Sequence, residues 1–75
     1  MTKAFVLVNS ETGYEKENLE NIKKLSSILE AYRVYGVYDI IVLVEEQDIS
    51  LLKETIFHHI RMLQGVRATL TLLIV

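Results

Sequence analysis

The sequence contains no cysteine, so it can form neither a disulfide framework nor a thiolate metal site. Proline is absent as well. No apolar run approaches the roughly 20 residues that a membrane-spanning helix needs. The N-terminus lacks the basic segment, the apolar segment and the cleavage site of a signal peptide. These absences predict a cytoplasmic protein without a membrane span.

A basic excess is also missing. The formal net charge is −2 at pH 7, whereas a nucleic-acid-binding surface normally carries an excess of lysine and arginine. Hydrophobic residues make up 51% of only 75 residues. A chain of this length buries only roughly 60% of the surface that its unfolded form exposes. We therefore expect one small domain over residues 1–75, with no direct nucleic-acid contact and with excess apolar surface covered by another subunit.

The motifs of common enzymes and metal sites are absent. There is no Gly-x-Ser-x-Gly elbow, and the loop over residues 9–13 has one glycine and no lysine, unlike a phosphate-binding loop. His58 and His59 are neighbours on a predicted helix, where they point about 100° apart and cannot chelate one ion together. The sequence therefore predicts a protein that is not an enzyme and that holds no cofactor or metal.

Two short apolar runs, residues 4–8 and 40–44, predict the central strands of a sheet. Neither run alternates apolar with polar residues, which is the pattern of a strand buried on both faces. Residues 28–35 and 66–75 predict two further strands.

Two helices are predicted between these strands. Residues 15–27 carry apolar residues at every third position, with acidic residues at the start and lysines near the end. A second helix over residues 49–63 has the clearest periodicity in the chain. We expect Asp48 to cap its start and Gly65 to cap its end. Its predicted apolar stripe consists of Ile49, Leu52, Ile56, Ile60 and Leu63.

The order strand, helix, strand, strand, helix, strand predicts a ferredoxin-like α+β fold. Right-handed crossovers in this βαββαβ plan put both helices on one face of a four-stranded antiparallel sheet. The other face has no helix to cover it, yet its residues are too apolar for water. We therefore predict a homodimer that forms through the sheets.

The turn over residues 32–39 contains the most informative polar residue. Gly36 supplies the conformational freedom that a short turn needs. Asp39 is the only acidic residue between Glu30 and Glu45, and it either caps backbone amides of the turn or faces a positively charged partner. Arg33 either binds a carboxylate or pairs with a surface acid such as Glu30.

The tyrosines of this turn leave two interpretations open. Tyr32, Tyr35 and Tyr38 could line a pocket. Tyrosines on and beside strands are more often half-buried packing residues whose hydroxyls reach water.

Two segments resemble a known family. Residues 31–39, Ala-Tyr-Arg-Val-Tyr-Gly-Val-Tyr-Asp, look like the strand-turn-strand signature of the Lrp/AsnC ligand-sensing domain, also called the RAM domain. Residues 65–72, Gly-Val-Arg-Ala-Thr-Leu-Thr-Leu, resemble the closing strand of that domain. The resemblance covers essentially the whole chain, in the element order of the family.

The resemblance implies a domain that dimerises through its sheets, with dimers joining into octameric or decameric rings. Small effectors, usually amino acids, bind at the interfaces between dimers in this family. By this resemblance Gly36, Tyr38 and Asp39 would lie at the effector site, with Asp39 receiving the ammonium group of the ligand. Thr69 and Thr71 would add hydroxyl contacts. An α-amino acid requires such a set of one anionic acceptor and several donors.

Regulators of this family carry a helix-turn-helix domain before the sensing domain. Here the first strand begins near Ala4, so the resemblance implies a stand-alone sensing domain that acts in transcription regulation by co-assembling with full-length regulators. Two alternatives stay open. One is an assembly module without an effector, and the other is a regulatory subunit of a metabolic enzyme, similar to the ACT domain.

Overall fold

The computed structural model describes Met1–Val75 as alternating strands and helices. The predicted order of strand, helix, strand, strand, helix, strand is confirmed. Small changes affect the boundaries: the first and third strands are longer than expected, and the second and fourth end two residues earlier. The elements are β1 (Thr2–Ser10), α1 (Glu15–Lys23), β2 (Ile28–Arg33), β3 (Ile40–Glu46), α2 (Ile49–Glu54), η1 (Thr55–Ile60) and β4 (Val66–Leu73).

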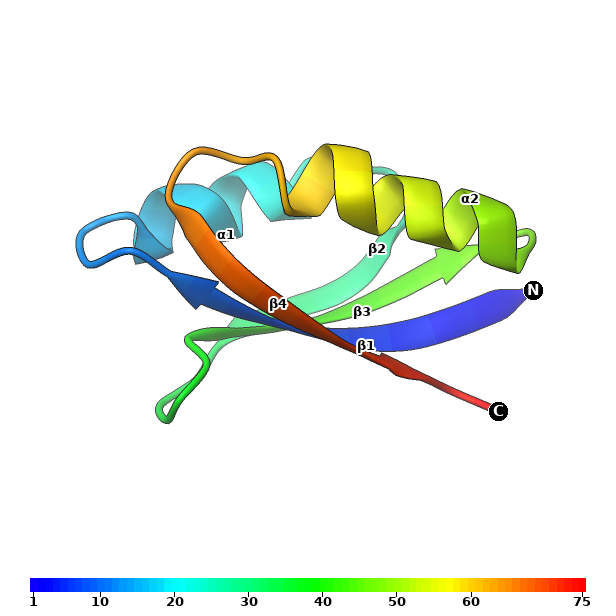
Figure 1. Ribbon diagram of the computed structural model, residues 1–75, viewed down its shortest axis with the longest axis horizontal. Coiled ribbons are helices and arrows are strands. Elements are labelled where there is room, and N and C mark those ends of the chain that lie inside the picture. The colour runs from blue at the N-terminus through cyan, green and yellow to red at the C-terminus, as the bar shows by residue number, and fades with distance from the viewer.

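The four strands form one antiparallel sheet in the order β2-β3-β1-β4. The two strands with continuous apolar runs, β1 and β3, are central, as predicted. Both helices cover the same face of the sheet and leave the opposite face open (Figure 1). The ferredoxin-like α+β fold is therefore confirmed. None of the helices combines the length and the apolar character that a membrane span requires.

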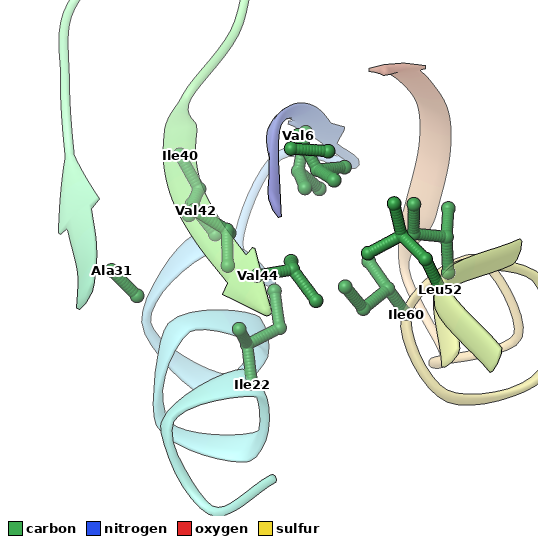
Figure 2. Packing of buried hydrophobic residues seen from close by; sticks show 11 residues of the cluster. Val6, Ile22, Ala31, Ile40, Val42, Val44, Leu52 and Ile60 are labelled. Atoms are coloured by element: carbon green, nitrogen blue, oxygen red, sulfur yellow. The ribbon is translucent and has the colours of Figure 1, made fainter. Parts of the chain in front are cut away.

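The core lies between the helices and the covered face of the sheet. Alternate residues of β1 and β3 point into it and meet Ile22 of α1 and Ile60 of η1 (Figure 2). The residues between them in sequence point to the open face, where Phe5 of β1 keeps 38% of its surface exposed. The prediction that both faces of β1 and β3 are buried thus holds for one face within a single chain. The core residues on the two strands are Ala4, Val6, Val8, Ile40, Val42 and Val44.

The first helix is shorter than predicted, because it ends at Lys23 instead of residue 27. Its last turn tightens, since the N–H of Leu25 donates to the carbonyl of Ile22, three residues earlier, at 3.0 Å. Ser27 lies directly before β2, and its carbonyl accepts from the N–H of Glu45 at 2.9 Å. The acidic first turn and the basic last turn are confirmed.

The second helix begins as predicted and ends differently. Oδ1 of Asp48 accepts from the N–H of Leu51 at 2.9 Å, which confirms the N-cap. From Thr55 onward the helix is π-helical, and the N–H of Arg61 donates to the carbonyl of Ile56, five residues earlier. The periodicity of the sequence did not predict this wider segment. At the start of the stripe, Ile49 is exposed instead of buried.

Gly65 is not the residue that caps the second helix, because the π-helical segment ends at Ile60. It lies just before β4 with a φ of 88°, which favours glycine. A Cβ atom on Gly65 would lie only 2.4 Å from Cγ of Tyr14, so the glycine also admits this ring. The position therefore requires glycine for two reasons, a positive φ and close packing.

Candidate functional site

Asp39 lies directly before β3, and its backbone extends the pairing of β3 with β1. Its backbone N–H donates to the carbonyl of Val8 at 2.8 Å. Its Oδ2 accepts from the backbone N–H of Ser10 at 2.7 Å. Asp39 is therefore a cap, but for an amide of β1 and not for the amides of its own turn. Its Oδ1 accepts no hydrogen bond from the chain.

The turn between β2 and β3 is held at both ends. The N–H of Val34 donates to the carbonyl of Asp39 at 2.8 Å and closes the hairpin. Nδ2 of Asn9 donates to the carbonyl of Val37 at 2.8 Å and ties the turn to β1. Gly36, at the tip, has a φ of 141° that other residues rarely adopt. The turn projects from the sheet on the side away from the helices (Figure 1).

The tyrosines are more exposed than the packing interpretation predicted. Tyr35 is fully exposed at 106%, and Tyr32 is exposed as well, so that prediction is wrong for these two residues. Only Tyr38 is partly buried. The hydroxyl of Tyr32 donates to Oε1 of Glu30 at 2.5 Å, and this carboxylate raises the pKa of Tyr32. Exposed aromatic rings in a projecting turn are typical of contact surfaces.

The expected pair of Arg33 with Glu30 does not form. The only ion pair in the chain joins Lys3 and Glu45. Glu30 lies opposite Leu43 and Arg33 lies opposite Ile40, so the two side chains point to opposite faces of the sheet. Arg33 instead lines a groove of about 280 Å³ together with Val34 and Tyr35.

Thr69 and Thr71 lie on β4, on the face that the helices cover. They stand opposite Val8 and Val6 in the register of β1 with β4. Strand β1 separates β4 from β3, so one chain does not bring these hydroxyls together with Asp39. Thr71 lines an apolar groove of about 360 Å³ between β4 and the second helix. A site that contains both threonines and Asp39 therefore needs a second chain.

Three polar residues that contact Asp39 or support its contacts were not identified from the sequence: Asn9, Ser10 and Asn18. Ser10 donates its backbone N–H to Asp39, and its Oγ accepts from Nδ2 of Asn18 at 3.0 Å. Asn18 is fully buried on α1. A signal was present, because Asn18 lies four residues before Ile22 and so on the apolar face of the predicted helix.

A second carboxylate, Glu46 at the end of β3, was also not predicted to matter. Its Oε2 accepts from the hydroxyls of Ser27 and of Thr55, the latter at 2.6 Å. These bonds, Ser27 first, lower the pKa of Glu46 below its ordinary value. His59 lines the same hollow, and both histidines are exposed. No group of three potential metal ligands occurs in the chain.

Solved structures include several close likenesses. FFRP-DM1 is 35% identical to the chain, with a TM-score of 0.97 and full coverage of both chains. TTHA0845 from Thermus thermophilus is also 35% identical, with a TM-score of 0.95, and the match covers 100% of this chain and 94% of that one. Both relatives are therefore about as long as the present chain.

A longer protein shares the fold at lower identity. The transcriptional regulator NMB0573 from Neisseria meningitidis, solved as a complex with L-Met, is 14% identical with a TM-score of 0.87. The match covers 99% of this chain but 49% of the regulator. At this identity the likeness shows the fold alone.

A comparison with curated proteins gave no match. The family model of the Lrp/AsnC ligand binding domain matches residues 3–75. This match spans nearly the whole chain and includes both segments that carry the sequence resemblance. The chain belongs to the Lrp/AsnC ligand-binding domain family.

Proposed function

We propose that residues 1–75 form a single stand-alone domain that binds an amino-acid effector and oligomerises. In this proposal it takes part in transcription regulation by co-assembling with full-length Lrp/AsnC regulators. The observation that carries the proposal is the Asp39 carboxylate. It lies beside an exposed turn, and one of its oxygens has no donor, in a chain of a ligand-binding family.

The chemistry of this carboxylate suits an ammonium group. No lysine or arginine of the chain forms an ion pair with Asp39, so its charge is not neutralised within the chain. Oδ1 is free to accept a charge-assisted hydrogen bond from the ligand. The backbone of Gly36 and the hydroxyl of Tyr38 supply further polar groups for the rest of the amino acid. That NMB0573 was solved with L-Met supports this ligand class.

The open face of the sheet supports a homodimer. Its residues are apolar and remain accessible to water in the single chain. Packing this face against the same face of a second copy would bury them at the ordinary spacing of stacked sheets. The turn projects on this side of the sheet (Figure 1), where the second copy would lie. The apolar residues of this open face are Phe5, Leu7, Ile41, Leu43, Leu70 and Leu72.

Further contacts between dimers would complete the effector site. Thr69 and Thr71 lie across β1 from Asp39, so a ligand that reaches all three takes its contacts from two chains. A ring of four or five dimers, an octamer or a decamer, repeats such a contact in a closed assembly.

Thermal unfolding with each standard amino acid in turn tests the effector site. A ligand at 100 times its dissociation constant adds about 2.7 kcal/mol of stability. We expect one or a few amino acids to raise the Tm. Asp39→Asn should abolish the rise, because it removes the charge but keeps an acceptor for Ser10.

Asp48→Asn is the matched control, since asparagine is an equally good N-cap. It should keep the ligand response. A flat result for all amino acids, or an undiminished response in Asp39→Asn, would contradict an effector site at the turn. The flat result would favour the second candidate, an assembly module in which Asp39 only caps β1.

Sedimentation analysis tests the dimer. We expect the wild-type chain to sediment as a dimer or larger, and Leu72→Glu on the open face to sediment as a monomer. Ile49→Glu is the control, because Ile49 is similarly exposed, at 45% against 48% for Leu72, but lies in the helix layer. A monomeric wild-type protein at micromolar concentration would refute the sheet-to-sheet dimer.

A further inference from the structure

Asn18 is a buried polar residue with one unsatisfied hydrogen-bonding atom. It is 0% exposed to solvent. Nδ2 donates to Oγ of Ser10 at 3.0 Å, while Oδ1 has no hydrogen-bond partner. A buried acceptor without a donor lowers stability, and an apolar side chain of the same shape would avoid this cost. The residue therefore calls for a role other than packing.

The partner of Asn18 stands where the end of β1 becomes irregular. The register of β1 with β4 shifts between Asn9 and Ser10. At this bulge the N–H of Ser10 donates to Oδ2 of Asp39 at 2.7 Å. Ser10 thus contacts Asn18 through its hydroxyl and Asp39 through its amide, and it is itself buried. A bulge of this kind re-aims the groups that it carries.

The chain is also held just after Ser10. The N–H of Glu11 donates to the carbonyl of Gly65 at 2.6 Å, which ties the chain to the start of β4. Ser10 is therefore fixed by Asn18 on its side chain and by Gly65 one residue later. These two attachments, together with the pairing of Ser10 with Val66 of β4, set the direction of the Ser10 N–H. The Ser10 N–H makes the shorter of the two hydrogen bonds to Oδ2 of Asp39, at 2.7 Å against 3.5 Å from Nδ2 of Asn9.

We propose that Asn18 is a positioning residue for the effector site. It holds Ser10 so that the Ser10 amide occupies Oδ2 of Asp39, and Oδ1 then faces the ammonium group of the ligand. Without this link the carboxylate rotates about its Cα–Cβ bond and binds the ammonium more weakly. This inference rests on the proposed function, but the link from Asn18 to Asp39 can be measured without a ligand.

The first experiment follows the Ser10 amide by NMR in the wild type, Asn18→Leu and Asn21→Leu. Leucine has the branched shape of asparagine and removes the orphan acceptor. Asn21 is the control, because it lies on the same helix and its side chain makes no hydrogen bond. In Asn18→Leu we expect the Ser10 amide proton to move upfield. Its hydrogen exchange should become about tenfold faster, as for one lost hydrogen bond.

A role in packing alone would change the exchange of all β1 amides together. The positioning role predicts a selective change at Ser10, with the amides of Val6 and Val8 unchanged. Ser10→Ala is the second variant, since it removes the hydroxyl that Asn18 holds and keeps the amide. An unchanged Ser10 amide in Asn18→Leu, or in Ser10→Ala should Asn18→Leu not fold, would overturn the proposal.

The second experiment uses the amino acid that raises the wild-type Tm most and measures its dissociation constant by calorimetry. We expect Asn18→Leu to weaken binding about tenfold and Asn21→Leu to leave it unchanged. Equal affinity in Asn18→Leu and the wild type would overturn the positioning role. If no amino acid binds the wild type, the proposed function fails. The chemical shift and exchange rate of the Ser10 amide then still show whether Asn18 positions Asp39.

Discussion

The two faces of the sheet are built from the same strands and have opposite surroundings. On β3, Ile40 points into the helix-covered core and is 0% exposed, while its neighbour Ile41 points to the open face. The same alternation separates Val6 from Phe5 on β1. Adjacent apolar residues therefore have different roles. One set stabilises the folded chain, and the other is available for association.

Polar residues follow the same division. Glu46 points to the helix side, where it accepts hydrogen bonds from Ser27 and Thr55. Glu45 points to the open side and makes a 3.8 Å ion pair with Lys3. Both glutamates link β3 to other segments, but Glu46 does so through two short hydrogen bonds on the covered face, whereas the ion pair of Glu45 on the open face is long and partly exposed to solvent.

The largest expected effect is the difference in unfolding free energy between Ile40→Ala and Ile41→Ala. Truncating a fully buried isoleucine costs about 2–5 kcal/mol of unfolding free energy, through lost burial and a cavity. We expect this loss for Ile40→Ala at every protein concentration. Ile41→Ala should cost less, and its cost should grow with protein concentration if its contacts form in the proposed dimer.

Urea denaturation over a range of protein concentrations measures both variants. Equal and concentration-independent losses of unfolding free energy would contradict the contrast between the two faces, because they would mean that the open face is buried within a single chain.

The next largest effect is the difference in stability loss between Glu46→Gln and Glu45→Gln. Glu46→Gln weakens two charge-assisted hydrogen bonds, and after allowance for its partial exposure we expect a loss of about 1 kcal/mol. Glu45→Gln removes one exposed ion pair and should cost less than about 0.5 kcal/mol. Chemical denaturation at neutral pH compares the two. A larger loss of unfolding free energy for Glu45→Gln than for Glu46→Gln would contradict the conclusion that the polar contacts of the covered face contribute more to stability.

A smaller effect is expected for Asn9→Ala at the open end of β1. The variant removes the 2.8 Å hydrogen bond to the carbonyl of Val37, which is worth about 0.5–1 kcal/mol. Hydrogen exchange should show faster opening of the turn amides, with the centre of β1 unaffected. Unchanged exchange in the turn would show that Asn9 does not hold it.

The smallest effect is the pH dependence that Glu46 contributes. Its pKa is lower in the folded chain than the ordinary 4.5, because the Ser27 and Thr55 hydroxyls stabilise the charged form. A carboxylate of this kind adds stability above its unfolded pKa and loses it as the pH falls through its folded pKa. The stability difference between wild type and Glu46→Gln should therefore be constant above about pH 5.5 and shrink below about pH 4.5. A difference that grows on acidification would mean that the pKa is raised.

Much of the fold could be predicted from local pattern. Element order, central strands and the Asp48 cap depend on residues close in sequence, so periodicity and capping rules report them. The π-helical segment could not be predicted, because its apolar spacing resembles that of an α-helix. The early end of α1 was missed because Ser26 and Ser27 were counted with the helix, although the carbonyl of Ser27 accepts from the N–H of Glu45 of β3.

The candidate site was predictable in part. The family resemblance of the turn sequence pointed to Gly36, Tyr38 and Asp39, which stay a prediction as effector contacts. The structure shows that this turn projects from the sheet and that only one carboxylate oxygen of Asp39 accepts hydrogen bonds within the chain. Its supporting residues could not be found in this way, because Ser10 is 29 positions from Asp39 in the chain. The separation of Thr69 from Asp39 could not be predicted from the sequence either, since it depends on which strand lies between them.

The sequence by itself determined the continuous apolar runs of the central strands, the element order and the family, because these are properties of neighbouring residues. Tertiary structure alone decided which of the two apolar faces the helices cover. It also decided that Asp39 caps an amide of β1, and that Asn18 is buried against Ser10. These relations join segments that only the packed sheet and helices bring together, and local propensity carries no information about them.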